Sequence, residues 1–571
     1  MKKAIGHLFA FLSCASWTTA QNVERNLRAS QATTQPERTP FELKRTVAVD
    51  GNLGVTSRQT QIVGAIVVDG VKYANTTAGV NAAIAEATSS QTVVVPSSFS
   101  LSGPINMDES GVTLQCINGA HLSLANGANA DIIIVTASNT RVTGCILDGN
   151  SANQTTAGYG INITPARVSH VDIDHNQIQN TWNEGIRIAN ASYLRIHENR
   201  LINNGDLASG PTTGHPAPSS FAIDYTMTAP SNETYITISD NDIDETASLI
   251  GGINLAANIA SGVIQKWHLD RNTVTVGDNG ASVELGIQAF AGALPGNIVS
   301  DGTINGNTIA GADTSNSSSW GISIGLAGVT HGNVTASGNT IRDTRATCIE
   351  GIGSGIVITG NSCDDTDGIT VTTNTASISG IVVASNVLTN GSGAYQNLAQ
   401  IGVSAYPRYT VRGLLVANNS IFNVPVSRAC IYINGNATGQ IKDSQIVGNY
   451  CQGQASGMTN HAILISQAAN VAVKNNMSRD WVGPQVYGLS VGSTSTGAIV
   501  FGNSFLNTTG PWQDQGTSTL IDDLAGAPFY LFAAEANGSR IYCTNCKIAN
   551  PCTTGGDGAL AKRLNGIWVC E

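Results

Sequence analysis

The sequence predicts an all-β solenoid, in which short parallel strands stack coil upon coil. In the stretch 183–204, apolar residues alternate with polar ones at Ile186–Ile188, Leu194–Ile196 and Leu201–Ile202, and each run is too short for a helix. An Asn followed two residues later by an apolar residue recurs along the chain. Charged residues are only 12% against about 25% in typical domains, and the 62 glycines fit tight corners.

The recurring Asn sets the length of each coil. Its steps run from 22 to 42 residues, which a β-solenoid tolerates because loops lengthen at a corner while the strands stay stacked. Each side-chain amide can bond to the Asn one coil away, so we expect an asparagine ladder. Its members are Asn176, Asn199, Asn241, Asn272, Asn307, Asn339, Asn361, Asn386, Asn419, Asn449 and Asn503, with Asn150 and Asn475 or Asn476 as looser members.

From Val67 to Phe505, this ladder resembles the right-handed parallel β-helix superfamily of pectate lyases, polygalacturonases and phage tailspikes. The resemblance implies a right-handed parallel β-helix with substrate along the strands that precede the ladder Asn. Asp364-Asp365 and Thr366-Asp367-Gly368 look like fragments of polygalacturonase motifs. The chain lacks that family's Gly-His-Gly and Arg-Ile-Lys, so the resemblance implies no polygalacturonase mechanism.

The chain divides into four expected segments: a signal peptide at 1–20, a flexible leader at 21–64, the β-helix at 65–512 and a Cys-rich module at 513–571. Lys2 and Lys3 followed by the apolar run Ala4–Trp17 are typical of a signal peptide, which predicts a secreted or surface protein of a bacterium. Lipidation at Cys14 is the rival interpretation. The acidic net charge of −11 argues against a nucleic-acid partner, and no other run approaches the ~20 apolar residues of a membrane helix.

The first structured element is a predicted helix at Thr77–Ala87, with Val80 and Ile84 on one face and Thr76 or Thr77 as its cap. A strand follows at Thr92–Val95. We expect this helix to cover the open edge of the first coil, because an exposed solenoid end invites association.

Without Cys14, ten cysteines remain, an even number that suits an oxidising compartment. Two pairs are about one coil apart and one pair lies within a turn, so each could form a disulfide. The four cysteines of the tail could form two disulfides, the favoured interpretation, or bind zinc. The pairs are Cys116 with Cys145, Cys430 with Cys451, and Cys348 with Cys363; the tail holds Cys543, Cys546, Cys552 and Cys570.

The candidate catalytic residues are Glu184, Arg187 and Asp224, which should point outward from neighbouring coils about 4.8 Å apart. As a hydrolase pair, the carboxylates would be about 8 Å apart at the backbone, which suits an inverting glycosidase. As a lyase, Arg187, His215 or Tyr159 would remove the proton beside a uronate carboxylate. Because these positions face outward, substitutions there should leave folding intact.

Further residues are expected to bind substrate or metal. Aromatic and amide side chains along the cleft would hold sugars. Four acidic residues form either a calcium site or a plain acidic turn; no cofactor is required, and calcium is possible. Histidines 170, 175, 197, 268, 331 and 461 show no metal-binding spacing. The expected substrate-binding set is Tyr159, Trp182, His215, Phe221, Asn254, Gln288 and Trp320, and the metal set is Glu350, Asp364, Asp365 and Asp367.

These observations favour a secreted carbohydrate-active enzyme that cleaves a polysaccharide by hydrolysis or β-elimination. The alternative is a non-catalytic β-helix, either an adhesin or a carbohydrate-binding scaffold, because a fold does not determine a reaction. The expected partner is a polysaccharide. The chain would be a monomer or, as the resemblance to tailspikes implies, a homotrimer.

Overall fold

The computed structural model describes residues 64–571, except 157, 165, 206–220, 247–250, 278–283, 312–318, 327–331, 374–375, 392–397, 437–439, 455–456, 484–485, 509, 528–536, 538, 550 and 557. The described residues lie within one compact unit, Val63–Glu571. The predicted signal peptide and most of the leader lie outside them. In the described part of the chain, no helix has both the length and the apolarity to cross a membrane.

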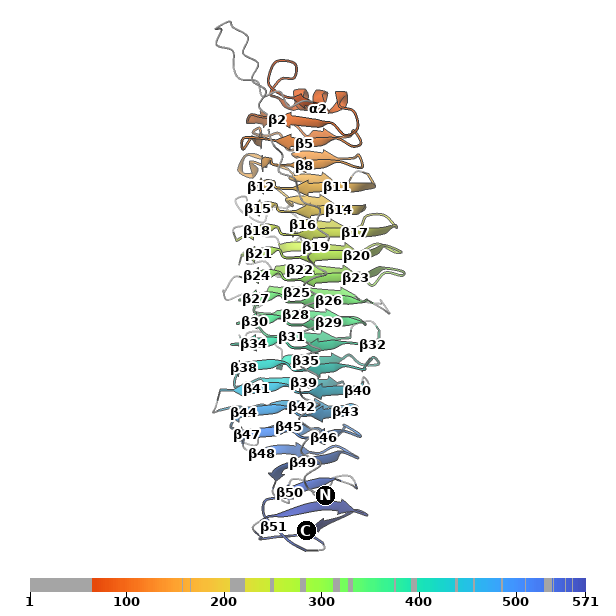
Figure 1. Ribbon diagram of the computed structural model, residues 1–571, viewed down its shortest axis with the longest axis vertical. Coiled ribbons are helices and arrows are strands. Elements are labelled where there is room, and N and C mark those ends of the chain that lie inside the picture. The colour runs from red at the N-terminus through yellow and green to blue at the C-terminus, as the bar shows by residue number, and fades with distance from the viewer. Residues whose placement is uncertain are drawn as a thin grey trace, which may run out of the picture. The chain divides into compact units, whose positions relative to one another are not determined.

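The chain folds as a right-handed parallel β-helix with three long sheets, and Figure 1 shows their strands stacked coil by coil. Sheet A has 22 strands, and sheets B and C have 15 each. The predicted stretch 183–204 contributes one strand to each: β13 (Ile186–Ile188) to sheet C, β14 (Ala191–His197) to sheet A and β15 (Arg200–Ile202) to sheet B. The sequence pattern therefore gave the strands of this coil correctly.

Sheet C presents the candidate cleft. Its inward positions form a continuous apolar ladder in register, from Ile161 and Ile186 through Ile223 to Ile431 and Ile463, all fully buried. The strands are β4 (Ile105–Met107), β7 (Ile133–Val135), β10 (Ile161–Ile163), β13, β16 (Phe221–Thr226), β19 (Gly251–Ala257), β22 (Glu284–Ala291), β25 (Ser319–Leu326), β28 (Thr347–Ile352), β31 (Ile369–Thr372), β35 (Ala399–Ala405), β39 (Ala429–Gly435), β42 (Ile463–Ser466), β45 (Tyr487–Val491) and β48 (Gly510–Asp514).

The asparagine ladder joins the coils without a break from Asn176 to Asn503. Each side-chain Nδ2 donates to Oδ1 of the next Asn, and the first and last of these bonds measure 3.1 and 3.0 Å. Asn476 belongs to the ladder. The expectation for Asn150 was wrong: it precedes a 3-10 turn (Ser151–Asn153), and the ladder position of that coil is held by the backbone of Cys145, whose N–H donates to Asn176.

The predicted helical cap is present as α2 (Thr77–Glu86). The hydroxyl of Thr76 accepts a hydrogen bond from the N–H of Gly79 at 3.2 Å, and Val80 and Ile84 are fully buried. The strand that follows, β2 (Thr92–Val95), has the predicted bounds. Burial of this apolar face covers the first coil, as the end of a solenoid requires.

The carboxyl end leaves the solenoid pattern. Strand β50 (Arg540–Cys543) pairs parallel with β49 (Leu520–Ala527), and then β53 (Ala559–Leu564) and β54 (Ile567–Cys570) add to the sheet in antiparallel order. The three disulfides of the solenoid connect the predicted partners, Cys116–Cys145, Cys348–Cys363 and Cys430–Cys451. The four cysteines of the tail form two disulfides, the favoured interpretation, and pair as Cys543–Cys546 and Cys552–Cys570, so they offer no thiol to a zinc ion.

Candidate functional site

A row of polar side chains follows the outer side of sheet C. Parallel register places Asn162, Arg187, Asp224, Asn254 and Gln288 side by side, one from each successive strand from β10 to β22. In each strand, the adjacent apolar residue faces the interior, so the row points away from the core. The outward register that the sequence predicted for these positions is confirmed.

Arg187 lies between the two candidate carboxylates. Its Nη1 is 3.5 Å from Oε1 of Glu184 and forms an ion pair with Oδ2 of Asp224. The side chains of Glu184 and Asp224 are only 7% and 6% exposed, and that of Arg187 is 20% exposed. These residues point away from the core and yet are covered. Arg187→Ala would leave two buried carboxylates without their cation, at about 3–5 kcal/mol, so the expectation of intact folding does not extend to that change.

Asp224 is held by further donors. Nδ2 of Asn254 and the hydroxyl of Thr226 both donate to its Oδ1, at 2.8 and 2.7 Å. Oδ1 of Asn254 is itself buried and accepts no hydrogen bond from any described residue. A buried acceptor of this kind is costly unless a donor reaches it, so Oδ1 of Asn254 would gain from a hydrogen bond donated beside Asp224.

Tyr159 lies on the side of Glu184, half-buried. Burial raises the pKa of its phenol, and the negative charge of Glu184 raises that pKa further. The backbone N–H of Tyr159 donates to Asp131, which also accepts from Asn162. The phenol therefore keeps its proton at neutral pH and serves as a donor, which makes Tyr159 a poor base.

Two residues of this site escaped the sequence reasoning. Thr226 stands two positions after Asp224 on the same strand, where the side-chain period of two returns it to the same face. Asp131 occupies the position of Tyr159 and Glu184 one coil earlier, two residues before the inward-facing Ile133. Continuing the strand alignment one coil towards the amino end would have found it.

The other expected substrate-binding residues lie in different surroundings. Trp182 and Phe221 are 8% and 2% exposed, so their rings offer little surface to a sugar. The ring of Phe221 packs over Gly251 of the next coil, where an added Cβ would lie 2.8 Å from it. Gln288 and Trp320 are half-buried in sheet C. His215 lies outside the described residues.

The four acidic residues expected to bind metal are spread over different environments. Glu350 is on β28 of sheet C, whereas Asp364 ends β30 (Ser362–Asp364) of sheet B and accepts hydrogen bonds from two side chains of the next coil. Asp365 occupies the corner with a φ of 49°. Asp367 is fully buried and forms an ion pair with Arg428 at 3.4 Å. Within the described residues, these four do not meet the geometry of a shared metal site.

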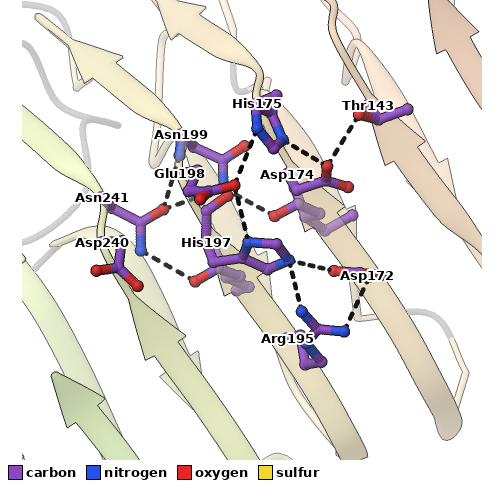
Figure 2. A network of polar contacts seen from close by, with 12 residues as sticks. Thr143, Asp172, Asp174, His175, Arg195, His197, Glu198, Asn199, Asp240 and Asn241 are labelled. Carbon is purple, nitrogen blue, oxygen red and sulfur yellow. Dashed lines mark hydrogen bonds and ion pairs between the residues drawn. The ribbon is translucent and has the colours of Figure 1, made fainter. Parts of the chain in front are cut away.

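A different group could hold a metal ion, on sheet A. Ligand atoms of Asp172, Asp174 and His197 lie within 4.8 Å of one another. Figure 2 shows them on adjacent coils, since Asp174 of β11 (Val168–Asp174) pairs in register with His197 of β14. The sequence did not reveal the group, because its members come from two coils and the two paired residues are 23 positions apart.

This group also has protein cations close by. Arg141 donates from Nε and Nη2 to the two oxygens of Asp174, at 2.7 and 2.6 Å, and His175 Nδ1 lies 2.7 Å from Oδ2. Burial raises the pKa of Asp174, but these hydrogen bonds lower it to about 2. His197 Nε2 contacts Asp172 at 2.9 Å (Figure 2). A metal ion would therefore compete with Arg141 for the same oxygens.

No family model matches this chain, and no curated protein does. Solved structures with similar architecture include the A-module of a mannuronan C-5 epimerase from Azotobacter vinelandii, with 13% identity, a TM-score of 0.27 and coverage of 80% of this chain and 100% of that one. Another is a double mutant of the tailspike protein of E. coli bacteriophage HK620 in complex with a pentasaccharide, with 11% identity, a TM-score of 0.45 and coverage of 82% and 77%. At these values, the resemblance assigns neither substrate nor activity to this chain.

Proposed function

We propose that this protein is a secreted carbohydrate-active enzyme that hydrolyses a glycan on the outer side of sheet C. One observation carries the proposal: two buried carboxylates from neighbouring coils, Glu184 and Asp224, share the guanidinium of Arg187 in a chain with only 12% charged residues. Burying three ionised groups together is costly, so they are retained more readily for chemistry than for stability. The five disulfides support folding in an oxidising compartment, as secretion requires.

The surroundings of the two carboxylates suggest different roles. The contacts of Asp224 with Arg187, Asn254 and Thr226 are all with donors, which suits an anionic nucleophile. Glu184 stands farther from Arg187 and beside the protonated phenol of Tyr159. We therefore assign Glu184 as the general acid and base. A pair of carboxyl groups in unlike environments is the usual way in which a glycosidase divides these tasks.

The separation of the pair favours retention of configuration. Both carboxylates contact the same atom, Nη1 of Arg187, and the longer contact is 3.5 Å, so their nearest oxygens lie less than about 7 Å apart. This upper limit excludes most of the roughly 6.5–9.5 Å range of inverting enzymes and admits the roughly 5–5.5 Å of retaining ones. The estimate of about 8 Å from backbone positions was larger because the side chains converge on Arg187.

The proposed reaction has two steps. Asp224 attacks the anomeric carbon while Glu184 gives its proton to the leaving oxygen, which forms a glycosyl ester on Asp224. Glu184 then takes a proton from water, whose oxygen replaces Asp224. Arg187 stabilises the carboxylate charge as it returns to Asp224. No metal ion enters these steps, so calcium at Asp172, Asp174 and His197 would act on stability and leave turnover unchanged.

A polysaccharide panel tests the proposal, read by reducing ends and by absorbance near 235 nm, where an unsaturated uronate absorbs (an approximate value for the product of elimination). We expect reducing ends to appear without absorbance. NMR should show that the first-formed product has the same anomeric configuration, α or β, as the substrate. Glu184→Gln and Asp224→Asn should lower kcat by at least about 100-fold, whereas Ser490→Ala, on the same outer row, should not. If absorbance rises together with reducing ends, the reaction is elimination and the proposed hydrolysis is wrong. Full activity of both variants would exclude this site.

One observation favours the non-catalytic alternative. The contacts of Asp224 with Arg187, Asn254 and Thr226 are also those expected of a static ion-pair network without a catalytic role. A glycan-binding scaffold would retain binding across the panel with no reducing ends released. Binding without turnover by the unsubstituted protein would therefore decide for the scaffold.

A further inference from the structure

Gly402 leaves a gap in the outer row of sheet C. It lies inside β35, between Thr370 of β31 and Tyr432 of β39 in register. A Cβ built on Gly402 would meet no described atom within 4 Å, and its backbone is not left-handed. Glycine inside a strand costs roughly 0.5–1 kcal/mol relative to alanine. No feature of the described fold requires a glycine at this position.

Two other strand glycines of the solenoid have a packing reason. A Cβ on Gly325 would lie 2.9 Å from the ring of Phe290, and one on Gly302 would lie 1.9 Å from the ring of Trp267. These glycines make room for a neighbouring side chain, whereas Gly402 makes room for none among the described residues. A glycine of this second kind often marks a place where a ligand comes close to the strand.

The walls of the gap carry polar groups, one of which lacks a hydrogen-bond partner. Oγ1 of Thr370 is buried and has no hydrogen-bond partner among the described residues. Tyr432, half-buried on the opposite side, has a phenol whose pKa is raised by burial. Ser404 lies two positions after Gly402 on β35, and Asn434 lies two positions after Tyr432 on β39. Both are half-buried on the same face. The gap is therefore lined by hydroxyls, an amide and one aromatic ring.

The charge around the gap is balanced. Arg428 and Asp367, both almost fully buried, form an ion pair with each other. Glu350 lies one coil beyond Thr370 and accepts a hydrogen bond from Ser323 at 3.1 Å, and burial raises the pKa of its carboxyl. A uronate would meet no uncompensated cation among these groups, so the lining suits a neutral ligand.

We propose that the gap at Gly402 is a binding site for a neutral sugar ring, with the Thr370 hydroxyl as a direct hydrogen-bonding partner and Tyr432 as the opposite wall. Hydroxyl-rich linings with one aromatic wall match the alternating polar edges and apolar faces of a pyranose. Six strand steps separate Gly402 from Asp224, about 29 Å at 4.8 Å per step. The site is thus distinct from the reacting carboxylates, and it needs only binding, so it stands even if no cleavage occurs.

Two substitutions test the site while leaving the fold in place. Gly402→Val fills the gap, and because a β-branched residue suits a strand, the melting temperature should stay equal or rise. Thr370→Val removes a hydroxyl that has no partner, which should also leave the melting temperature unchanged. Gly103→Val is the matched control, since a Cβ there also meets no described atom within 4 Å and its backbone is not left-handed, at the far end of the solenoid.

Binding is measured by calorimetry on the full mature chain, in a Glu184→Gln background that prevents turnover. The probes are maltohexaose, cellohexaose, isomaltohexaose and chitohexaose as neutral glycans, and hexagalacturonate and hexamannuronate as charged ones. We expect at least one neutral hexaose to bind, at least about tenfold more weakly to Gly402→Val and severalfold more weakly to Thr370→Val, with Gly103→Val unchanged. Binding of uronates alone, of no hexaose, or of a neutral hexaose with equal affinity by both test variants would overturn the proposal.

Discussion

Glu350 and Asp224 occupy the same outer row of sheet C, but their surroundings differ. Asp224 is ion-paired to Arg187, whereas Glu350 has a hydrogen bond from Ser323, and burial raises the pKa of its carboxyl above the usual range. Strand alternation predicted that the side chain of Asp224 points outward. It could not predict the burial of either side chain, because the cover over a strand face comes from segments distant in the sequence.

Glu350→Gln should make stability less dependent on pH. A carboxyl whose pKa is raised by folding favours the folded state below its unfolded pKa, near 4.5, and that contribution is lost as pH rises through the folded pKa. The unsubstituted protein should therefore lose stability relative to Glu350→Gln between about pH 4 and pH 8. Melting temperatures of both proteins at the two pH values measure this. If the melting temperatures of the two proteins differ by the same amount at both pH values, burial does not raise the pKa of Glu350.

Among the elements, α2 is the clearest match between sequence and structure. Its helical period, its Thr76 cap and its buried residues Val80 and Ile84 were all readable from local spacing. Local signals suffice here because helix, cap and apolar face lie within about a dozen residues. The loops that flank sheet C carry no such period, which is why the surroundings of Trp182 and Phe221 could not be foreseen.

Ile84→Ala should loosen the amino-terminal cap only. Removing a buried isoleucine side chain costs about 2–5 kcal/mol, and in a solenoid each coil contacts only its neighbours. Hydrogen exchange should rise in α2 and β2 and stay unchanged beyond the first few coils. Ala82→Gln, at an exposed position of the same helix, is the control. Faster exchange along the whole β-helix would contradict this local picture.

At the scale of the whole molecule, the asparagine ladder couples the coils. Oδ1 of Asn272 accepts from both the N–H and Nδ2 of Asn241, at 3.1 and 2.9 Å, and its Nδ2 donates to the carbonyl of Ile238 at 3.0 Å. Asn272 is 1% exposed, so no bulk water replaces these bonds. The ladder was predictable because a single residue type repeats at each coil from Asn176 to Asn503.

Asn272→Ala should weaken the middle of the β-helix. It leaves a buried N–H and a buried carbonyl without partners, at about 1–3 kcal/mol each. We expect a lower melting temperature and a broader transition, as the coils on either side become less coupled. Asn232→Ala, at an exposed position at the start of β17 (Asn232–Ser239), should change neither. An unaltered transition in Asn272→Ala would show that the ladder is dispensable.

The sequence was informative about the fold and the outer row, and much less so about chemistry. Repetition revealed the coils, the disulfide pairs of the solenoid and the register of Arg187, Asp224 and Asn254. It could not separate an outward residue from an exposed one, nor reveal that Asp174 meets His197. Such contacts depend on side-chain reach between coils, which register alone does not determine.

The hydrogen bonds of the ladder do not depend on the number of residues between its members. Asn199 and Asn241 are 42 residues apart and Asn339 and Asn361 only 22, yet the joining bonds measure 3.0 and 2.8 Å. Inserting or deleting residues at a corner therefore leaves the strand register of every later coil unchanged. A lineage carrying this scaffold can remodel the borders of the outer face of sheet C by insertion and deletion alone, while the hydrophobic interior is inherited intact.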